Sequence, residues 1–560
     1  MLNIKSIAEK IVALRWITIV FVMLVTLFLG NQLRDLKIDA DILRSLPDSD
    51  EHARLLKKIA ENFGGNNMGV IILEAESIYQ TKVLEQVRSI TDSLMEIEGI
   101  SSVSSLTNII YIKGDDDGIE IGTLVDEYEL PESYESLEIL RKNVNSNEMY
   151  KGTIVSEDGT STLIIFTLED TADVNNVAAD VIATTKEMQL TEKLYYTGSP
   201  MLVSSISELM KKDLTTLLPL AFILIAIILF LSFRSLTGVL LPLLTAIIAI
   251  IWSLGLMALL GFKMSMISNN IPIILLAIGT AYAIHVINRI EQMRSKSIPK
   301  PVSAALVHVM IPVLLAAITT SIGFLSFIFG AYLEMIVDFG IFTALGTLFA
   351  CLLSICFVPA ILGLISTKNK LDLAKKERDP GFIEKFLQKL NTLLFKHPKY
   401  IFMAWMLLIA ISIVGVFSIE RSVNIQEFFK KGNATRRAEN IMVEKFGGTK
   451  PVFVLFEGNI QSPEVLNKMM ETTAYMEKSP DIYTSLSVAT LISEINLAIT
   501  GIREIPNDIT KVAQLWFLID GNETLERLVN EDLTQAIIIS KFKSPDNEAK
   551  KEFANSLLDF

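Results

Sequence analysis

Polar side chains interrupt one apolar segment of the chain, and they are the first candidates for chemistry. The segment 274–289 reads ILLAIGTAYAIHVINR and contains no aspartate or glutamate. On a helix, Ala281, His285 and Asn288 fall on one stripe at i, i+4 and i+7, with Tyr282 beside it. Because an imidazole can titrate near neutral pH, His285 could carry a proton within a membrane.

A structural role is the alternative for the same residues. His285 could instead hydrogen-bond a neighbouring helix, as ordinary interhelical polar contacts do. The small residues Gly279 and Ala281 are typical of helices that approach each other closely. The hydroxyl groups expected within reach of His285 are those of Thr319, Thr320 and Ser321. Proton transfer and helix contact both fit this pattern of residues, and the pattern favours helix contact over direct proton coupling.

The composition shows which elements must position these residues. The chain has 560 residues, of which 51% are hydrophobic, and its mean hydropathy is +0.44. A hydrocarbon core about 30 Å thick requires roughly 20 apolar residues per helix. The segments that qualify are 14–31, 214–233, 236–260, 270–289, 304–329, 335–365 and 400–418. The sequence therefore predicts a polytopic α-helical membrane protein.

Charge predicts the orientation of these helices. The basic residues near the membrane segments form three groups: Lys5, Lys10 and Arg15; Arg289, Arg294, Lys296 and Lys300; Lys368, Lys370, Lys375, Lys376 and Arg378. The positive-inside rule places all three in the cytoplasm, in a multi-pass protein of the inner or plasma membrane. The polar stretches 33–210 and 420–560 are then outside. Residues 33–208 carry 14 Lys and Arg against 33 Asp and Glu, so nucleic acid is a poor partner.

Motifs for enzymatic or cofactor chemistry are missing from the sequence, and we expect no enzyme activity, no cofactor and no metal. The four histidines are scattered and show no zinc spacing. Cys351 and Cys356 lie in one helix, five residues apart, and cannot readily bridge. The run from Asp115 to Gly118 could bind calcium, but it lacks the further ligands of a known loop. A hairpin tip is the favoured interpretation of that run.

An internal repeat organises the chain. ENFGG at 61–65 returns as EKFGG at 444–448, and a strand-like run follows each copy. A second match joins IVSEDGTSTLIIF at 154–166 with LVNEDLTQAIIIS at 528–540. We infer a duplicated half, with Phe63–Gly64 and Phe446–Gly447 each ending a helix that leads into a first strand. Each exterior domain should be an α+β domain of βαβ type with a mixed sheet.

These boundaries predict six regions. They are an N-terminal segment with helix 1 at 1–32, a first exterior α+β domain at 33–213, helices 2 to 6 at 214–366, a cytoplasmic linker at 367–399, helix 7 at 400–418, and a second, incomplete exterior domain at 419–560. The linker contains the segment 381–396, whose apolar residues share one face with lysines opposite. This pattern is typical of an amphipathic helix on the inner leaflet.

Several motifs resemble a known family. They are YYTGSPML before helix 2, GTAYAIHVINR in helix 4, IPVLLAAITTSIGFLSF in helix 5 and DFGIFTALGTLFACLLSICFVPAIL in helix 6. With the repeat, they resemble the RND superfamily, closest to its MMPL-like exporters of lipids and hydrophobes, which are related to the sterol-sensing proteins Patched and Dispatched. The resemblance implies porter-like exterior domains and helices 2 to 6 that are similar to a sterol-sensing domain. It also implies helices 8 to 12, which a longer chain, a homo-oligomer or a partner would supply.

The resemblance also implies roles for single residues. Many RND transporters have an aspartate for proton relay where this chain has Ala281, about 16 Å deep in helix 4. Asp338 resembles an acidic position of the family, although a carboxylate near a helix start is also favoured by the helix dipole. The candidate coupling or polar residues are Tyr282, His285, Asn288, Thr319, Thr320 and Asp338.

The resemblance implies an ion-gradient-driven exporter of hydrophobic or lipid-like substrates. One alternative is a sterol-sensor-like receptor or scaffold that binds lipid without active transport. A second is an accessory of Sec-type protein translocation, which would have a shorter exterior domain than the one predicted here.

Overall fold

Two compact units make up this computed structural model. It describes residues 4–63, 67–115, 118–126, 128–147, 150–169, 171–365, 382–419, 429–430, 432–448, 451–521, 525, 527–542 and 547–560. The helical unit comprises Met1–Asp50 with Ile206–Arg421. The sheet unit comprises Glu51–Ser205 with Ser422–Phe560, so both copies of the predicted exterior domain belong to one body.

The helical unit confirms the predicted class of a polytopic helical membrane protein. Within the described residues, seven helices are long and apolar enough to cross a membrane. Each of the seven contains one of the following helices: α2 (Arg15–Gln32), α7 (Ser199–Phe233), α8 (Leu236–Leu259), α9 (Ile271–Ser295), α10 (Pro301–Leu325), α12 (Glu334–Leu364) and α15 (Pro398–Val416). Three shorter helices accompany them: α1 (Ile4–Ala13), α11 (Phe327–Gly330) and α14 (Phe382–Lys396).

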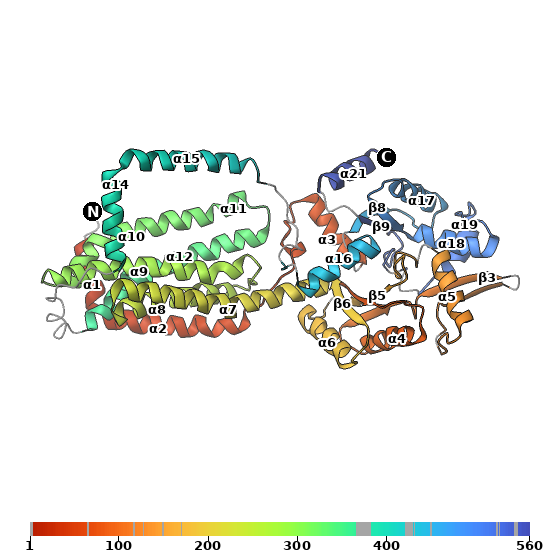
Figure 1. Cartoon of the computed structure of the whole chain (residues 1–560), viewed down its shortest axis with the longest axis horizontal. Helices are drawn as coiled ribbons and strands as arrows, with labels where there is room; N and C mark the ends of the chain where they lie inside the picture. Colours follow the sequence, from red (N-terminus) through yellow and green to blue (C-terminus); the bar gives the residue numbers. More distant parts are fainter. Residues whose placement is uncertain are drawn as a thin grey trace. The chain divides into compact units, whose positions relative to one another are not determined.

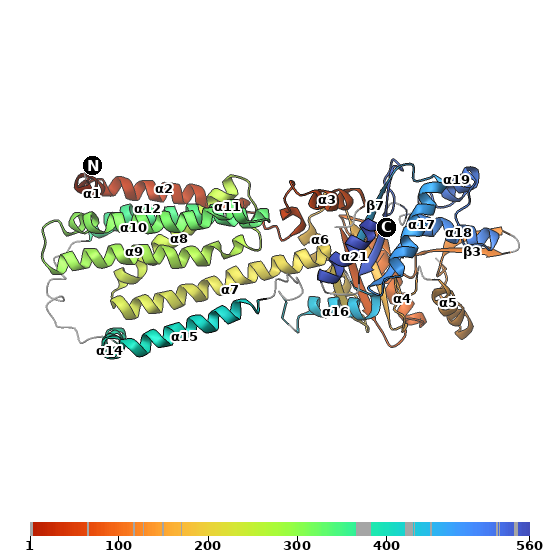
Figure 2. The same ribbon diagram turned by 90° about the horizontal axis from the view of Figure 1, so that it is seen from above.

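The core of the helical unit lies between α8, α9, α10 and α12, with α2 along α8 and α12 (Figures 1 and 2). Glycines allow close approach there. A Cβ added at Gly279 of α9 would lie 3.2 Å from Ala246 of α8 and 3.5 Å from Ala350 of α12. Helices α7 and α15 differ from the core helices, because only 6% and 0% of the residues in their apolar stretches are buried. Their apolar side chains are therefore available to lipid or to further helices.

The first half of the sheet unit is an antiparallel sheet with the order β2-β5-β1-β6. Its strands are β1 (Met68–Glu74), β2 (Ile100–Ser104), β5 (Ser161–Leu168) and β6 (Lys193–Gly198). Helices α4 (Thr81–Met95) and α6 (Val174–Glu187) connect β1 to β2 and β5 to β6. Both helices bury apolar side chains against one face of the sheet.

The mixed sheet predicted for this half is wrong. Every hydrogen-bonded neighbour is antiparallel, because the two βαβ units are split. Strand β5 lies between β1 and β2, and β1 lies between β5 and β6. The strands joined by a crossover helix are parallel to each other but never adjacent, as in split βαβ folds.

A hairpin and a helix are inserted between β2 and β5. They are β3 (Ile110–Asp115), β4 (Gly118–Thr123) and α5 (Tyr134–Ser146). Asp115 pairs with Gly118, so the acidic run occurs at the end of a hairpin, as its favoured interpretation predicted. Asp116 and Asp117 themselves lie outside the described residues.

The second half of the sheet unit repeats the first in the order β7-β9-β8, which corresponds to β1-β5-β2. Its strands are β7 (Pro451–Glu457), β8 (Ile482–Leu486) and β9 (Gln535–Phe542). Its helices are α17 (Pro463–Glu477), α18 (Val488–Thr500), α19 (Ile509–Phe517) and α21 (Asn547–Asp559). The matching strand order supports the duplication inferred from the sequence.

The helix before the first strand of each copy is exchanged between the copies. Phe63 and Phe446 are the last residues of α3 (Glu51–Phe63) and α16 (Ala434–Phe446), at equivalent places as predicted. Gly64 lies outside the described residues. Phe63 packs with Ile537 of β9 in the second copy, whereas Phe446 packs with Ile72 of β1 in the first. Figure 2 shows α3 and α16 at opposite sides of the sheet unit.

Polar contacts accompany this exchange. The Nζ of Lys445 in α16 lies 3.5 Å from carboxylate oxygens of both Glu74 and Asp158 and donates a 3.0 Å hydrogen bond to Ser161. Near the other end of β5, Arg527 donates a hydrogen bond of 3.0 Å to Thr167. The two copies are thus joined by charged contacts as well as by apolar ones.

Asp158 should make the sheet unit sensitive to acid. Burial raises the pKa of this carboxyl, but hydrogen bonds from Ser156 and Thr160 and the charge of Lys445 together lower it to about 2. A carboxylate whose pKa falls on folding stabilises the protein above its unfolded pKa of about 3.9, and this contribution is lost as the pH falls toward 2. We expect Asp158→Asn to reduce the loss of stability between pH 4 and pH 3, measured by hydrogen exchange of β5. The exposed Asp180 supplies the control variant, Asp180→Asn, and an equal effect of both changes would contradict this role.

Candidate functional site

The predicted stripe on α9 divides between two faces of the helix. Tyr282 points into the helical core, where it is 7% exposed and its hydroxyl lies close to Thr320 of α10. Ala281, His285 and Asn288 are exposed and face away from the core. The structure therefore brings Tyr282 and Thr320 together and leaves the polar stripe on an open face.

The hydrogen bond predicted from His285 to a hydroxyl group of α10 is not formed. Thr319 and Thr320 donate to the carbonyl oxygen of Ala316 in their own helix, at 3.0 and 2.8 Å. Ser321 donates to the carbonyl of Ala344 in α12, at 3.2 Å. His285 lies on the opposite side of α9 from the core, which explains why none of these hydroxyls reaches it.

Asp338 is the acidic candidate of the helical unit. It is half-buried in the second turn of α12, four residues after Glu334, so the two carboxylates lie on the same face of the helix. Another carboxylate, Glu291 of α9, forms a 3.1 Å ion pair with Arg294. An ionisable side chain inside a membrane span is costly and usually functional, so Asp338 carries the strongest case for ion binding.

The small residues of α9 also differ in their surroundings. Gly279 is buried against α8 and α12. Ala281 faces outward with His285. Any contact that Ala281 makes must therefore come from outside the core of α8, α9, α10 and α12.

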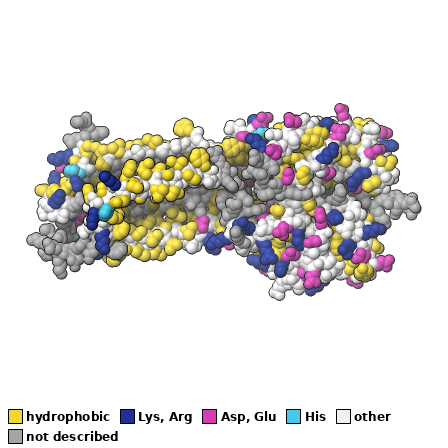
Figure 3. All heavy atoms as spheres, turned by 45° about the horizontal axis from the view of Figure 1, so that its top comes forward, with side chains coloured by type: hydrophobic (Ala, Val, Ile, Leu, Met, Phe, Trp, Pro, Cys, Tyr) yellow, Lys and Arg dark blue, Asp and Glu magenta, His cyan; other side chains and the backbone are white. Residues whose placement is uncertain are grey.

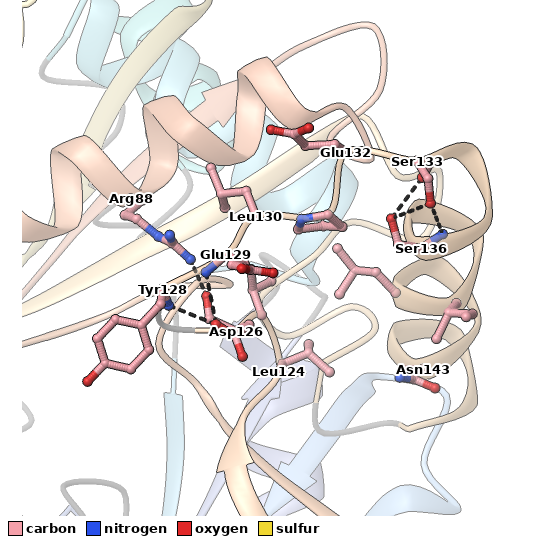
Figure 4. Close-up of a pocket in the computed structure, with 14 residues that line it drawn as sticks. Arg88, Leu124, Asp126, Tyr128, Glu129, Leu130, Glu132, Ser133, Ser136 and Asn143 are labelled. Carbon is pink, nitrogen blue, oxygen red and sulfur yellow. Dashed lines mark hydrogen bonds between the residues drawn. The ribbon is translucent and has the colours of Figure 1, made fainter.

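A hollow of about 840 Å³ lies in the sheet unit between α4 and α5 (Figure 4). Asp126 is at its centre and accepts hydrogen bonds from the backbone N–H groups of Glu129 and Tyr128, which lower the pKa of its carboxyl. The guanidinium of Arg88 donates to the Asp126 carbonyl oxygen. The volume falls in the range of ligand pockets, about 300–1,000 Å³. However, the Asp126 carboxylate orders its own loop, and the acidic side chains in the lining do not suit an apolar cargo.

A smaller hollow of about 170 Å³ lies where the insertion of the first copy meets the second copy. Lys541 lines it, and burial lowers the pKa of this ammonium group to about 8. The volume is below the usual range of ligand pockets, so this hollow cannot enclose a lipid chain. Within the described part of the chain, no group of three His, Cys, Asp or Glu side chains could hold a metal ion.

The two units differ in the side chains that they expose. Figure 3 shows apolar side chains over the visible face of the helical unit and mixed acidic and basic side chains over the sheet unit. A broad apolar surface of this kind suits contact with lipid. Three polar contacts between the copies have no signal in the sequence: Lys445 with Ser161, Glu439 with Thr197, and Arg527 with Thr167. The repeat identified α16, the helix that bears Glu439 and Lys445, but no local pattern predicted their partners.

Comparison with known proteins agrees with this architecture. Residues 42–400 match the model of the MMPL family. One relative is the "Putative membrane protein MJ1562" of Methanocaldococcus jannaschii, 26% identical over 378 residues that span 64% of this chain and 93% of that protein. The chain therefore belongs to the MMPL family of RND-type membrane transporters.

Proposed function

We propose that this MMPL-family protein exports hydrophobic or lipid-like molecules and uses an ion gradient as its energy source. The observation that carries the ion-coupled part is Asp338, a half-buried carboxylate within a membrane span beside a second acidic residue. Family membership supports transport as the class of activity. The apolar surfaces of α7 and α15 suit a cargo that reaches the protein through the lipid.

Efflux from reconstituted vesicles tests the proposal. The full chain is placed in liposomes loaded with a fluorescent phospholipid or with Nile red, and a pH or sodium gradient is then imposed. We expect probe movement that depends on the gradient and stops when an ionophore dissipates it. Probe movement that is the same with and without the gradients would contradict ion coupling. If the protein moves neither probe, export is contradicted.

A second candidate is a lipid-binding receptor without active transport. The observation that favours it is Ala281, because this position of α9 lacks the carboxylate that the resemblance to RND transporters implies. A receptor of this kind would bind a fluorescent sterol or phospholipid saturably in detergent, yet would move neither probe across a membrane. Binding and efflux measured on the same preparation separate the two functions.

The proposed direction of transport requires the sheet unit to lie outside the cell. We expect a cysteine at Tyr128, in a background with Cys351 and Cys356 replaced by serine, to react with a membrane-impermeant maleimide in intact cells. A cysteine at Lys296 should react only after the cells are permeabilised, because Arg289, Arg294, Lys296 and Lys300 favour the cytoplasm. Both positions are exposed in the structure. The reverse labelling pattern would overturn the orientation.

A further inference from the structure

Helix α14 exposes a row of large apolar side chains. Phe386, Leu387, Leu390, Leu393, Leu394 and Phe395 are each at least 40% exposed. At 100° per residue, all of them except Phe395 fall within an arc of about 120°. A contiguous apolar face of this kind on a charged helix is unfavourable in water and indicates a surface that something else covers.

The position of α14 in the chain indicates what covers it. It ends at Lys396, and α15 begins at Pro398, so only His397 separates them. Pro398 stands at the first position of α15, where it ends the preceding helix and permits the turn. Figure 1 shows α14 at a steep angle to α15.

The length of α15 places this turn at the membrane surface. Its 19 residues span about 28 Å at 1.5 Å per residue, close to the roughly 30 Å of the hydrocarbon core. No spare length remains to carry α14 away from the bilayer. The end of α14 must therefore lie at the level of the lipid headgroups.

The charges of α14 indicate which lipids it meets. Lys389 and Lys396 are exposed and lie along one edge of the apolar face, about 40–60° from Leu393. Lys399, in the first turn of α15, is exposed as well. Lysines in this place extend their stems along the apolar face and their ammonium groups toward the headgroups, where anionic lipids attract them.

We propose that α14 is an anionic-lipid-binding helix: its leucine and phenylalanine face lies in the headgroup region, and Lys389 and Lys396 bind acidic headgroups. This proposal does not depend on the transport function, because it concerns how the link between the two halves of the repeat is held at the bilayer. The occupant of the apolar face is the lipid surface itself.

Spin labels on opposite faces of α14 test the proposal. Single cysteines at Leu390 and at Thr392, about 160° apart on the helix, are labelled in the full chain with Cys351 and Cys356 replaced by serine. The protein is reconstituted in phosphatidylcholine with or without phosphatidylglycerol. Collision with oxygen reports contact with lipid, and collision with a nickel chelate reports contact with water.

We expect oxygen to dominate at Leu390 and nickel at Thr392, with the contrast larger when phosphatidylglycerol is present. The double variant Lys389→Glu, Lys396→Glu should lose that dependence on phosphatidylglycerol. The matched control Lys478→Glu, Lys511→Glu makes the same change of charge on exposed lysines of the sheet unit and should keep it. Nickel access at both labels, or shielding of both labels from both reagents, would overturn the membrane contact. Equal contrast in both lipids would overturn the preference for acidic headgroups.

Discussion

Replacing Gly198 with alanine is expected to destabilise the sheet unit by about 2–5 kcal/mol. Gly198 ends β6 and directly precedes α7, the long helix that continues into the helical unit. Its φ of +89° lies in the left-handed region, which costs a residue with a Cβ about 1–2 kcal/mol. In addition, its Cβ would lie 2.5 Å from the carbonyl oxygen of Met68 and 2.9 Å from the Cα of Gly69. These are backbone atoms of the neighbouring strand, so relief requires β6 to move away from β1.

Gly501 offers a matched control for this prediction. It has a φ of +75° at the end of α18, but a Cβ there would meet nothing within 4 Å. Gly501→Ala should therefore cost only the conformational part, about 1–2 kcal/mol. Hydrogen exchange of the amides in β1, β6 and α18, followed by mass spectrometry of the full chain in detergent, measures both changes locally. Equal losses in the two variants would show that the contact between β6 and β1 is not as close as described.

Replacing Asp338 with asparagine should reduce gradient-driven efflux to the rate of protein-free liposomes. An ion-coupled carrier needs a group inside its membrane span that binds and releases the ion. Asparagine keeps the size and the hydrogen-bonding capacity of aspartate but takes up no proton and offers no charge to a cation. Because Asp338 is half-buried near the start of α12, the change should leave the fold intact.

Two further variants make this result specific. Glu334→Gln changes an exposed carboxylate one turn earlier on the same helix and should keep efflux. His285→Asn should also keep efflux, because His285 faces away from the helical core and has none of the predicted contacts with α10. Because the hydroxyl groups of α10 bond to backbone carbonyls and not to His285, His285→Leu should remove no interhelical hydrogen bond with α10.

The outcomes of this series separate the possible coupling groups. Full efflux in a folded Asp338→Asn variant would show that the ion binds elsewhere. Loss of efflux in His285→Asn with an unchanged melting temperature would instead assign the proton to α9. Melting temperatures in detergent show whether each variant is folded, so a loss of activity is not confused with a loss of structure.

The sequence alone determined the membrane architecture. A membrane span needs about 20 consecutive apolar residues, so hydropathy locates each helix without reference to its neighbours. The seven predicted segments all fall on apolar helices of the structure. The repeat likewise placed Phe63 and Phe446 at equivalent helix ends, because duplicated sequences keep the same local order of helix and strand.

Only the tertiary structure decided which surfaces meet. The sequence of a strand does not determine which strands pair with it. The position of β5 between β1 and β2 could therefore not be predicted, and the sheet was expected to be mixed. The exchange of α3 and α16 was equally hidden, since the two copies have similar apolar faces and either could cover either sheet. On α9, the pattern grouped Tyr282 with His285, but helix contacts turned Tyr282 toward Thr320 and left His285 outside. Helical periodicity defines the faces of an element, whereas the choice of the face that is buried depends on residues far away in the chain.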